Sequence, residues 1–155
     1  MNFEDELSSL ASLLQVKEFG TGASNTDIEA AERTLQVRFS DSFHFFLKRF
    51  GWAGLEHLEI YGLGPDVPPH LNLVDAAIRE RTGMQPLLPH FLVPVMNDGA
   101  GNHFCLDTGE IVRGECPVVF WCHEEGTSQL PQKVAGSFAE WLINQVKELI
   151  QGSSD

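Results

Sequence analysis

Apolar residues in the first fifty positions recur every three or four residues, which is the spacing of amphipathic helices. The first stripe predicts a helix over 3–16, and its members are Phe3, Leu7, Leu10 and Leu14. The stretch 20–25, rich in Gly, Ser and Asn, ends this period. Thr26 and Glu29 then have the spacing of a capping box, so a second helix is expected over 27–37.

Two further helices are marked by capping residues at their ends. Ser40 or Asp41 can start a helix over 41–50, and Gly51 stands where a left-handed residue commonly ends one. Ser137 and Glu140 form a second capping-box pattern and open a helix over 137–150. The two apolar stripes are Phe43, Phe46, Leu47 and Phe50 in the first helix, and Phe138, Trp141, Leu142, Val146 and Leu149 in the second.

Between these helices the hydrophobic pattern changes to that of β-strands. Strands are predicted over 58–62, 92–96, 103–107 and 118–122. The last of these is apolar throughout, so we expect it to be covered on both faces. Residues 72–81 can form another short helix. The tripeptide Thr108-Gly109-Glu110 predicts a tight hairpin between 103–107 and 111–115.

These elements predict one α+β domain over residues 1–155. Helices, then a run of strands, then a helix are typical of a mainly antiparallel sheet covered by N-terminal helices and a C-terminal helix. A chain of 155 residues can bury a hydrophobic core without disulfides or metals.

Charge is the most unusual property of the sequence. Ten Lys and Arg stand against 22 Asp and Glu, a formal net charge of −12. Residues 51–132 contain eleven carboxylates and only three basic side chains, namely Arg79, Arg81 and Arg113. Nucleic acids and anionic membranes are bound through many Lys and Arg contacts, so the charge argues against both. Acidity can serve solubility alone, but this distribution favours a basic protein partner.

The cysteines and the first residues indicate a compartment. Cys105, Cys116 and Cys122 are odd in number and lack C-x-x-C spacing, which favours a reducing environment over a disulfide framework. The segment MNFEDELSSL is acidic where a signal peptide is basic, and no apolar run reaches membrane-spanning length. We therefore expect a cytoplasmic protein.

Catalytic and metal-binding motifs are absent from the sequence. It has no nucleophile elbow, P-loop, zinc-protease helix or dinucleotide fingerprint. One cluster of soft ligands is conceivable and consists of His103, Cys105, Cys122 and His123. Cysteines in apolar strands are usually buried hydrophobic residues, however, and residues 122 and 123 point to opposite faces of a strand. We expect no metal, no cofactor and no catalytic residue.

Six carboxylates at strand ends offer the alternative of acid–base catalysis, as in a small hydrolase or a metal-dependent enzyme. They are Asp98, Asp107, Glu110, Glu115, Glu124 and Glu125. Acids at such positions are normally solvated. Asp98 can also accept backbone N–H bonds within the 97–102 loop, and Asp107 can do so at the 108–110 turn.

A partner-binding surface is expected from the loops and strand ends of residues 51–132. The candidates are Asp66, Glu110, Glu115, Glu124 and Glu125, with Trp52 as an anchor. Trp52 follows Gly51 at a helix end, so we expect it to be partly exposed, although a plain packing role is an equal alternative. Tyr61 and Trp121 lie within strands and are expected in the core.

Five segments resemble, in order, those of the SUKH superfamily, the cell-wall-assembly-regulator-like immunity proteins. They are IEAAERTLQVRFSDSFHFFLKRFGW (28–52), LEIYGLG (58–64), PVMNDGAGNHFCLD (94–107), VVFWCHEE (118–125) and SFAEWL (137–142). They are similar to the family's paired helices, its strand with Gly, its Gly-rich loop before a strand ending in Asp, its Trp-containing strand and its closing helix. Ser40 departs from the resemblance, because the family commonly has proline there.

The resemblance implies a function in protein binding. Bacterial members are mostly immunity proteins encoded beside polymorphic toxins, many of them nucleases, and eukaryotic relatives are signalling scaffolds. It therefore implies an immunity protein that neutralises a basic toxin domain by direct binding, with a regulatory scaffold as the alternative. We expect it to act as a monomer. The family is not defined by catalytic residues, so none is transferred.

Overall fold

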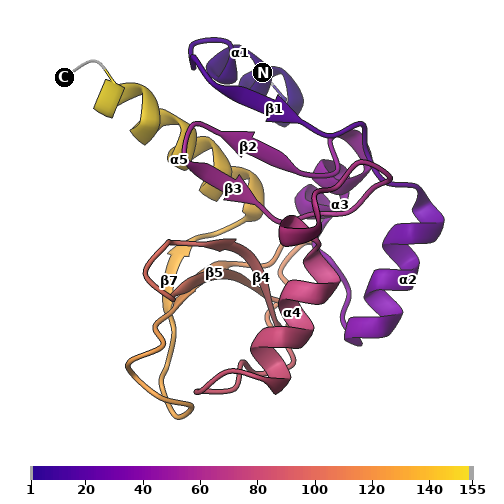
Figure 1. Ribbon diagram of the computed structural model, residues 1–155, viewed down its shortest axis with the longest axis vertical. Coiled ribbons are helices and arrows are strands. Elements are labelled where there is room, and N and C mark those ends of the chain that lie inside the picture. Colours follow the sequence, from indigo (N-terminus) through magenta and orange to yellow (C-terminus); the bar gives the residue numbers. More distant parts are fainter. Residues whose placement is uncertain (1, 154–155) are drawn as a thin grey trace.

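The computed structural model describes residues 2–153, which form five α-helices, one short 3-10 helix and a seven-stranded sheet (Figure 1). The helices are α1 (Phe3–Ala11), α2 (Asn25–Leu35), α3 (Asp41–Arg49), α4 (Leu73–Thr82) and α5 (Phe138–Ser153), with η1 at Pro69–Leu71. The strands are β1 (Lys17–Phe19), β2 (Ala53–Leu55), β3 (Leu58–Ile60), β4 (Leu92–Asn97), β5 (His103–Asp107), β6 (Val118–Trp121) and β7 (Gln132–Ala135).

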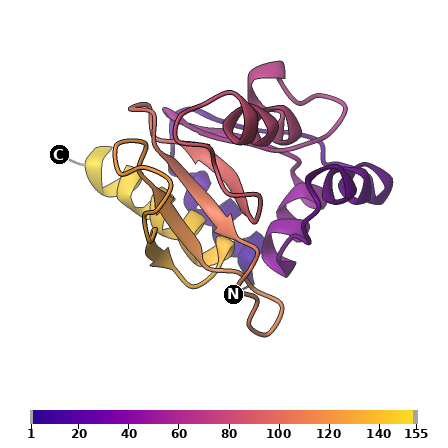
Figure 2. The same ribbon diagram turned by 90° about the horizontal axis from the view of Figure 1, so that it is seen from below.

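Each strand pairs antiparallel with the next one along the chain, in the order β1 to β7. The sheet has helices on both faces, and α4 and α5 lie on opposite sides of it (Figure 2). This arrangement confirms the predicted α+β fold. In the described part of the chain, no helix has the length and apolar character needed to cross a membrane.

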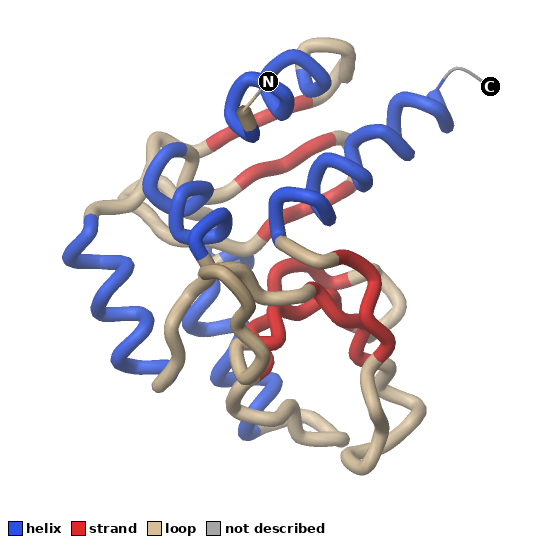
Figure 3. The backbone as a smooth tube through the Cα atoms, turned by 180° about the vertical axis from the view of Figure 1, so that it is seen from behind, coloured by secondary structure: helices blue, strands red, loops and turns tan. Residues whose placement is uncertain are grey.

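The main core contains buried residues of the sheet and of all five helices, whose arrangement around the strands can be followed in Figure 3. Its centre is aromatic: the ring of Phe138 contacts Phe43 at 4.8 Å, Phe46 at 5.2 Å and Trp141 at 5.7 Å between centroids. A smaller core on the other face consists of Leu88, Leu92, Cys105, Val119 and Trp121. Val118 belongs to the first core and Val119 to the second, so β6 is covered on both faces as predicted.

The first helix is shorter than predicted. It ends at Ala11 with Ser12 as its C-cap, not near residue 16. The chain then forms β1, whose Lys17, Glu18 and Phe19 pair with β2. Strand β1 was missed because it has only three residues and no apolar alternation of its own, and its pairing with β2 is long-range.

The start of α2 differs from the prediction, and the start of α5 agrees with it. Ser24, not Thr26, caps α2, and its hydroxyl accepts the backbone N–H of Asp27 at 3.1 Å. Ser137 caps the start of α5 as predicted, because its hydroxyl accepts the N–H of Glu140 at 3.1 Å. The Glu140 carboxylate in turn accepts a hydrogen bond from the N–H of Gly136 at 2.9 Å.

The N-terminus of α3 is capped from a distant loop. Ser40 makes no side-chain capping bond. Instead, Glu115 accepts the N–H and the hydroxyl of Ser42 at 3.0 and 2.8 Å. The predicted hairpin between 103–107 and 111–115 is wrong. Because that hairpin does not form, Glu115 can reach Ser42. Strand β5 pairs with β6 instead, and Val112 and Glu115 close a small turn within the connection.

Two glycines allow the end of α3 to pass directly against the end of β3. Gly51 has a φ of 84°, which confirms the predicted left-handed residue after α3. Its carbonyl accepts the N–H of Leu63 at 2.9 Å. A Cβ added to Gly62 would lie 1.6 Å from the Gly51 oxygen, so no larger residue fits. Gly62 also bonds to the backbone of Leu71 and Leu73, which fixes where α4 begins.

This crossing predicts a large difference between two glycine substitutions. We expect Gly62→Ala to lower the free energy of unfolding by about 3 kcal/mol or more, since the new methyl group must displace backbone. The matched control is Gly54→Ala in β2, where no atom lies within 4 Å of the added Cβ. That control should change stability by less than about 1 kcal/mol. Urea unfolding measures both, and equal losses would contradict the packing described.

Candidate functional site

A polar cleft opens beside α4, where β3 meets the loop between β4 and β5. Its volume is about 480 Å³. The lining residues are His57, Glu59, Tyr61, His70, Leu71, Arg79, Asn97, Asp98, Gly99 and Gly101. Strand alternation explains part of this set, because Glu59 points away from its neighbours in β3, Leu58 and Ile60, which pack in the main core.

Beneath the cleft lie two buried ionisable residues, His103 and Glu80. Their exposed fractions are 2% and 8%. The Tyr61 ring stacks on His103 with centroids 6.3 Å apart. Glu80 comes from α4, and its carboxylate lies 3.5 Å from Nε of Arg79 and 3.7 Å from Nδ1 of His103. The second distance is too long for a hydrogen bond, and neither ring nitrogen of His103 has a partner among the described residues.

The electrostatics of this group follow from burial. Desolvation lowers the pKa of His103, although the negative charge of Glu80 opposes this shift. Burial likewise raises the pKa of the Tyr61 phenol, against the charge of Arg79. The imidazole of His103 is therefore neutral at pH 7 and offers one donor and one acceptor nitrogen.

Hydrogen bonds join two loops at the rim of the cleft, the 97–102 loop and the segment 122–125. Asp98 accepts the N–H groups of Ala100 and Asn102 at 2.8 and 3.0 Å, which confirms its predicted structural role. Partial burial opposes ionisation of Asp98, but the bonds from Asn102 and Ala100 outweigh it and lower its pKa. The Asn102 side-chain oxygen then accepts the N–H of His123 at 3.0 Å. The segment 122–125 is thus held against the 97–102 loop.

Four exposed carboxylates surround this region, and we call them the acidic rim: Glu59, Asp98, Glu124 and Glu125. Glu59 and Asp98 line the cleft itself. Glu124 and Glu125 follow His123, whose ring packs against the position of Gly101 on the cleft wall. The Glu124 side chain is 80% exposed. Two of the predicted partner-binding residues therefore lie beside the cleft.

The other predicted residues lie elsewhere. Trp52 is only 5% exposed, so the expectation that it is partly exposed is wrong. Its indole N–H donates to Asp66 at 3.2 Å, and Asp66 also accepts the N–H of Thr21 at 3.1 Å. The aromatic ring is buried because the chain crossing after Gly51 brings the 61–66 loop over it.

Glu110 and Glu115 lie at the opposite end of β5 and β6 from the acidic rim. The register places Leu106 opposite Val118 and His103 opposite Trp121, so the 108–117 connection and the 122–131 loop emerge at opposite ends. Glu110 is exposed, while Glu115 is occupied in capping α3. The structure thus separates the predicted set into three places instead of one surface.

The soft-ligand residues do not form a metal site. Within residues 2–153, no three His, Cys, Asp or Glu side chains gather in a way that could hold a metal ion. Cys105 is buried, and burial raises the pKa of its thiol well above the ordinary value.

A family model described as SMI1-KNR4 cell-wall, one of the SUKH group, matches residues 5–147. The chain belongs to the SUKH superfamily. The match extends the resemblance found over 28–142 to include α1 and β1, which lie outside the segments that suggested it.

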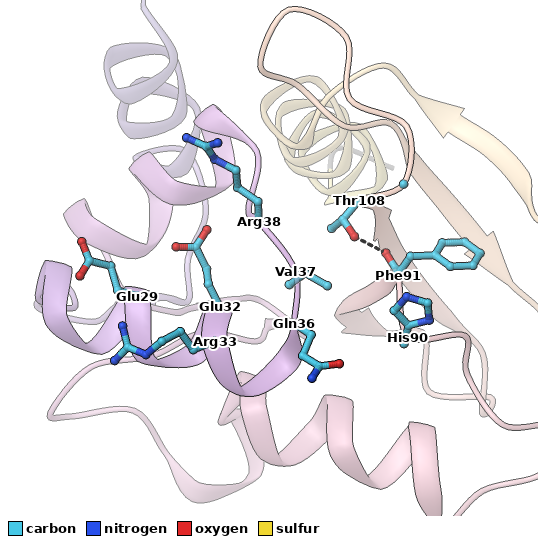
Figure 4. Close-up of a pocket in the computed structure, with 10 residues that line it drawn as sticks. Glu29, Glu32, Arg33, Gln36, Val37, Arg38, His90, Phe91 and Thr108 are labelled. Carbon is cyan, nitrogen blue, oxygen red and sulfur yellow. Dashed lines mark hydrogen bonds between the residues drawn. The ribbon is translucent and has the colours of Figure 1, made fainter.

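A second groove in this SUKH protein lies between α2 and the ends of β4 and β5 (Figure 4). Its volume is about 710 Å³. One wall comes from α2 and residues 36–38, and the other from His90, Phe91 and Thr108. Arg81 ties the walls together by donating to the carbonyls of Leu35 and His90. Two Glu and two Arg line this groove, so it has no excess charge to select a basic partner.

The sequence pattern indicates only part of the group beneath the cleft. Tyr61 is 4% exposed, as expected for a core residue, whereas His103 was expected only as a conceivable metal ligand, Arg79 only as one of three basic residues, and Glu80 had no expected role. A signal for the cleft exists over residues 57–60, where polar His57 and Glu59 alternate with apolar Leu58 and Ile60. Nothing local to the sequence indicates that α4 brings Glu80 to this face.

The buried histidine predicts a pH-dependent loss of stability. The folded protein binds a proton at His103 less readily than the unfolded chain, whose imidazole keeps the ordinary pKa of 6.5. The stability is therefore fully present above about pH 6.5 and is lost as the pH falls toward the lowered pKa. Urea unfolding across this range should show the loss in the native protein and a smaller one in His103→Phe. Exposed His57→Gln is the control and should behave like the native protein. An unchanged pH dependence in His103→Phe would contradict the assignment.

Proposed function

We propose that this SUKH protein is a cytoplasmic immunity protein that neutralises a basic toxin domain, such as a nuclease, by binding it directly. The observation that carries the proposal is the unpaired negative charge of residues 51–132. Superfamily membership supports a binding role, and the charge supports a basic partner.

Few of the eleven carboxylates in this half have a cationic partner. Within residues 2–153, the ion pairs that involve them are Glu59 with His70, Glu80 with Arg79 and His103, and Glu124 with His123. Only Glu80 faces a permanently charged group. Arg81 is engaged by backbone carbonyls instead. Since so little charge is neutralised internally, a negative potential must extend from these residues into solvent.

The acidic rim is the best place for the partner to bind. Its carboxylates are exposed. Glu59 comes from strand β3, and the other three come from loops that are already fixed by Asp98 and Asn102, so little conformational entropy is lost on binding. A toxin that acts on nucleic acid needs a cationic groove, and an acidic protein surface can cover that groove. Such a surface mainly accelerates association.

A regulatory scaffold remains the alternative, because the same surface could hold a basic partner without neutralising it. Co-expression separates the two roles. An immunity protein restores growth to cells that produce the neighbouring toxin domain, whereas a scaffold does not.

Reversing two rim charges should slow complex formation. We expect the double variant Glu124→Lys, Glu125→Lys to lower the association rate constant about tenfold at low salt, and the effect should shrink as salt screens the charges. Dissociation should change much less. Stopped-flow or surface-based kinetics across a salt series measures this with the toxin domain encoded beside the gene.

The matched control carries the same charge change at other exposed sites, Glu110→Lys and Glu148→Lys. It should alter association less than the rim variant, since Glu110 lies at the far end of β5, although Glu148 lines a pocket together with His57 of the cleft. If both double variants slow association equally, overall charge and not the rim governs the encounter. If the native protein neither binds nor protects against the toxin, the immunity role is refuted.

A further inference from the structure

The connection between β6 and β7, residues 122–131, holds one large apolar side chain almost entirely in solvent. Leu130 is 94% exposed. We infer that this connection is a preformed recognition loop and that Leu130 enters an apolar pocket of the basic partner, with Glu124 and Glu125 facing the cations that border that pocket. The inference rests on the proposed function and adds to the acidic rim the apolar contact that holds the partner.

The Gln129 side chain closes the loop from within. Its amide oxygen accepts the N–H of Cys122 at 3.1 Å, and its amide nitrogen donates to the carbonyls of Cys122 and Gly126, both at 2.8 Å. Gly126 has a φ of 76°, a left-handed conformation that glycine adopts without strain. The residue before Leu130 is thereby bonded to the end of β6, which fixes where Leu130 leaves the loop.

Asn102 holds the same loop from outside. Its side-chain oxygen accepts the backbone N–H of His123 at 3.0 Å and lies 2.7 Å from Nδ1 of the same residue. Its amide nitrogen donates to Asp98 at 2.9 Å. Two side-chain amides, one on each side, therefore order the loop.

This order serves no packing purpose in the free protein. None of residues 122–131 belongs to the main core or to the smaller core. An exposed apolar side chain is common on a protein surface. A loop ordered by five side-chain hydrogen bonds, yet outside both cores, is less common, and ordering a loop in advance reduces the entropy that it loses on binding.

The charges of the loop decide which kind of partner it fits. Within residues 2–153, Glu125 has no ion-pair partner, and Glu124 has only His123 at 3.8 Å. A second copy of the chain would bring the same carboxylates of two loops together, and like charges repel. A basic partner instead gains attraction around the apolar contact. An apolar centre with a charged rim is the usual anatomy of a protein interface.

Removing the apolar side chain should shorten the life of the complex. With the same toxin domain, Leu130→Ser should accelerate dissociation about tenfold and leave association nearly unchanged, because an apolar contact acts only after encounter. The matched control is Leu13→Ser, since Leu13 is 66% exposed in the turn after α1. That control should change neither rate. Both residues are exposed, so urea unfolding should give native stability for both variants.

Loosening the loop tests whether it is preformed. Gln129→Ala removes the bonds to Cys122 and Gly126. We expect faster hydrogen–deuterium exchange across residues 122–131 of the free variant and about tenfold weaker binding of the toxin domain. Faster exchange with unchanged affinity would refute the claim that the ordered loop makes the contact.

Two further outcomes separate this inference from the proposed function. If the complex forms and protects cells but dissociates no faster in Leu130→Ser, Leu130 is not the anchor while the immunity role stands. If the native protein binds no toxin domain, the role and this inference both fail. Sedimentation of the free protein should show a monomer. A dimer that Leu130→Ser abolishes would assign the loop to a second copy and overturn the inference.

Discussion

The close crossing of two chain segments at Gly51 and Gly62 is the constraint on which the candidate site depends. The Gly51 carbonyl occupies the space that a side chain at residue 62 would need. This contact fixes the end of α3 against the end of β3, and Gly62 in turn bonds to residues on either side of the start of α4. Helix α4 then runs over β4 and carries Glu80 to His103. A packing requirement between backbones thereby determines the position of a charged group.

Burial of Glu80 and His103 lowers the stability of the fold beside the candidate site. Burying a carboxylate and an imidazole without a mutual hydrogen bond costs free energy that a hydrophobic pair would not. The rest of the molecule can bear this cost, because its main core is a continuous set of aromatic contacts around Phe138. The loops above the cleft are meanwhile braced by Asp98 and Asn102, so the rim carboxylates are presented on a fixed framework. Such an arrangement suits recognition by preformed shape and charge.

Much of the fold was predictable because its signals are local. The apolar stripe of α3 with Gly51 after it, the strand over 103–107 and the backbone bonds of Asp98 all depend on residues close in sequence. What failed depends on distant contacts. Glu115 replaces Ser40 as the cap of α3 across 73 positions, and β5 pairs with β6 in place of the expected hairpin. Trp52 is buried by the 61–66 loop. The acidic bias was visible in composition, but only the strand register shows which carboxylates share a surface.

The central claim is that the partner binds over the cleft and its acidic rim. Hydrogen–deuterium exchange of the protein, free and in complex with the basic toxin domain that the proposed function requires, tests this most directly. The account predicts that complex formation slows exchange in residues 57–61, 97–101 and 122–126, with little change in the second groove. Slowed exchange confined to residues 36–38 and 108–112, with the cleft unaffected, would contradict it.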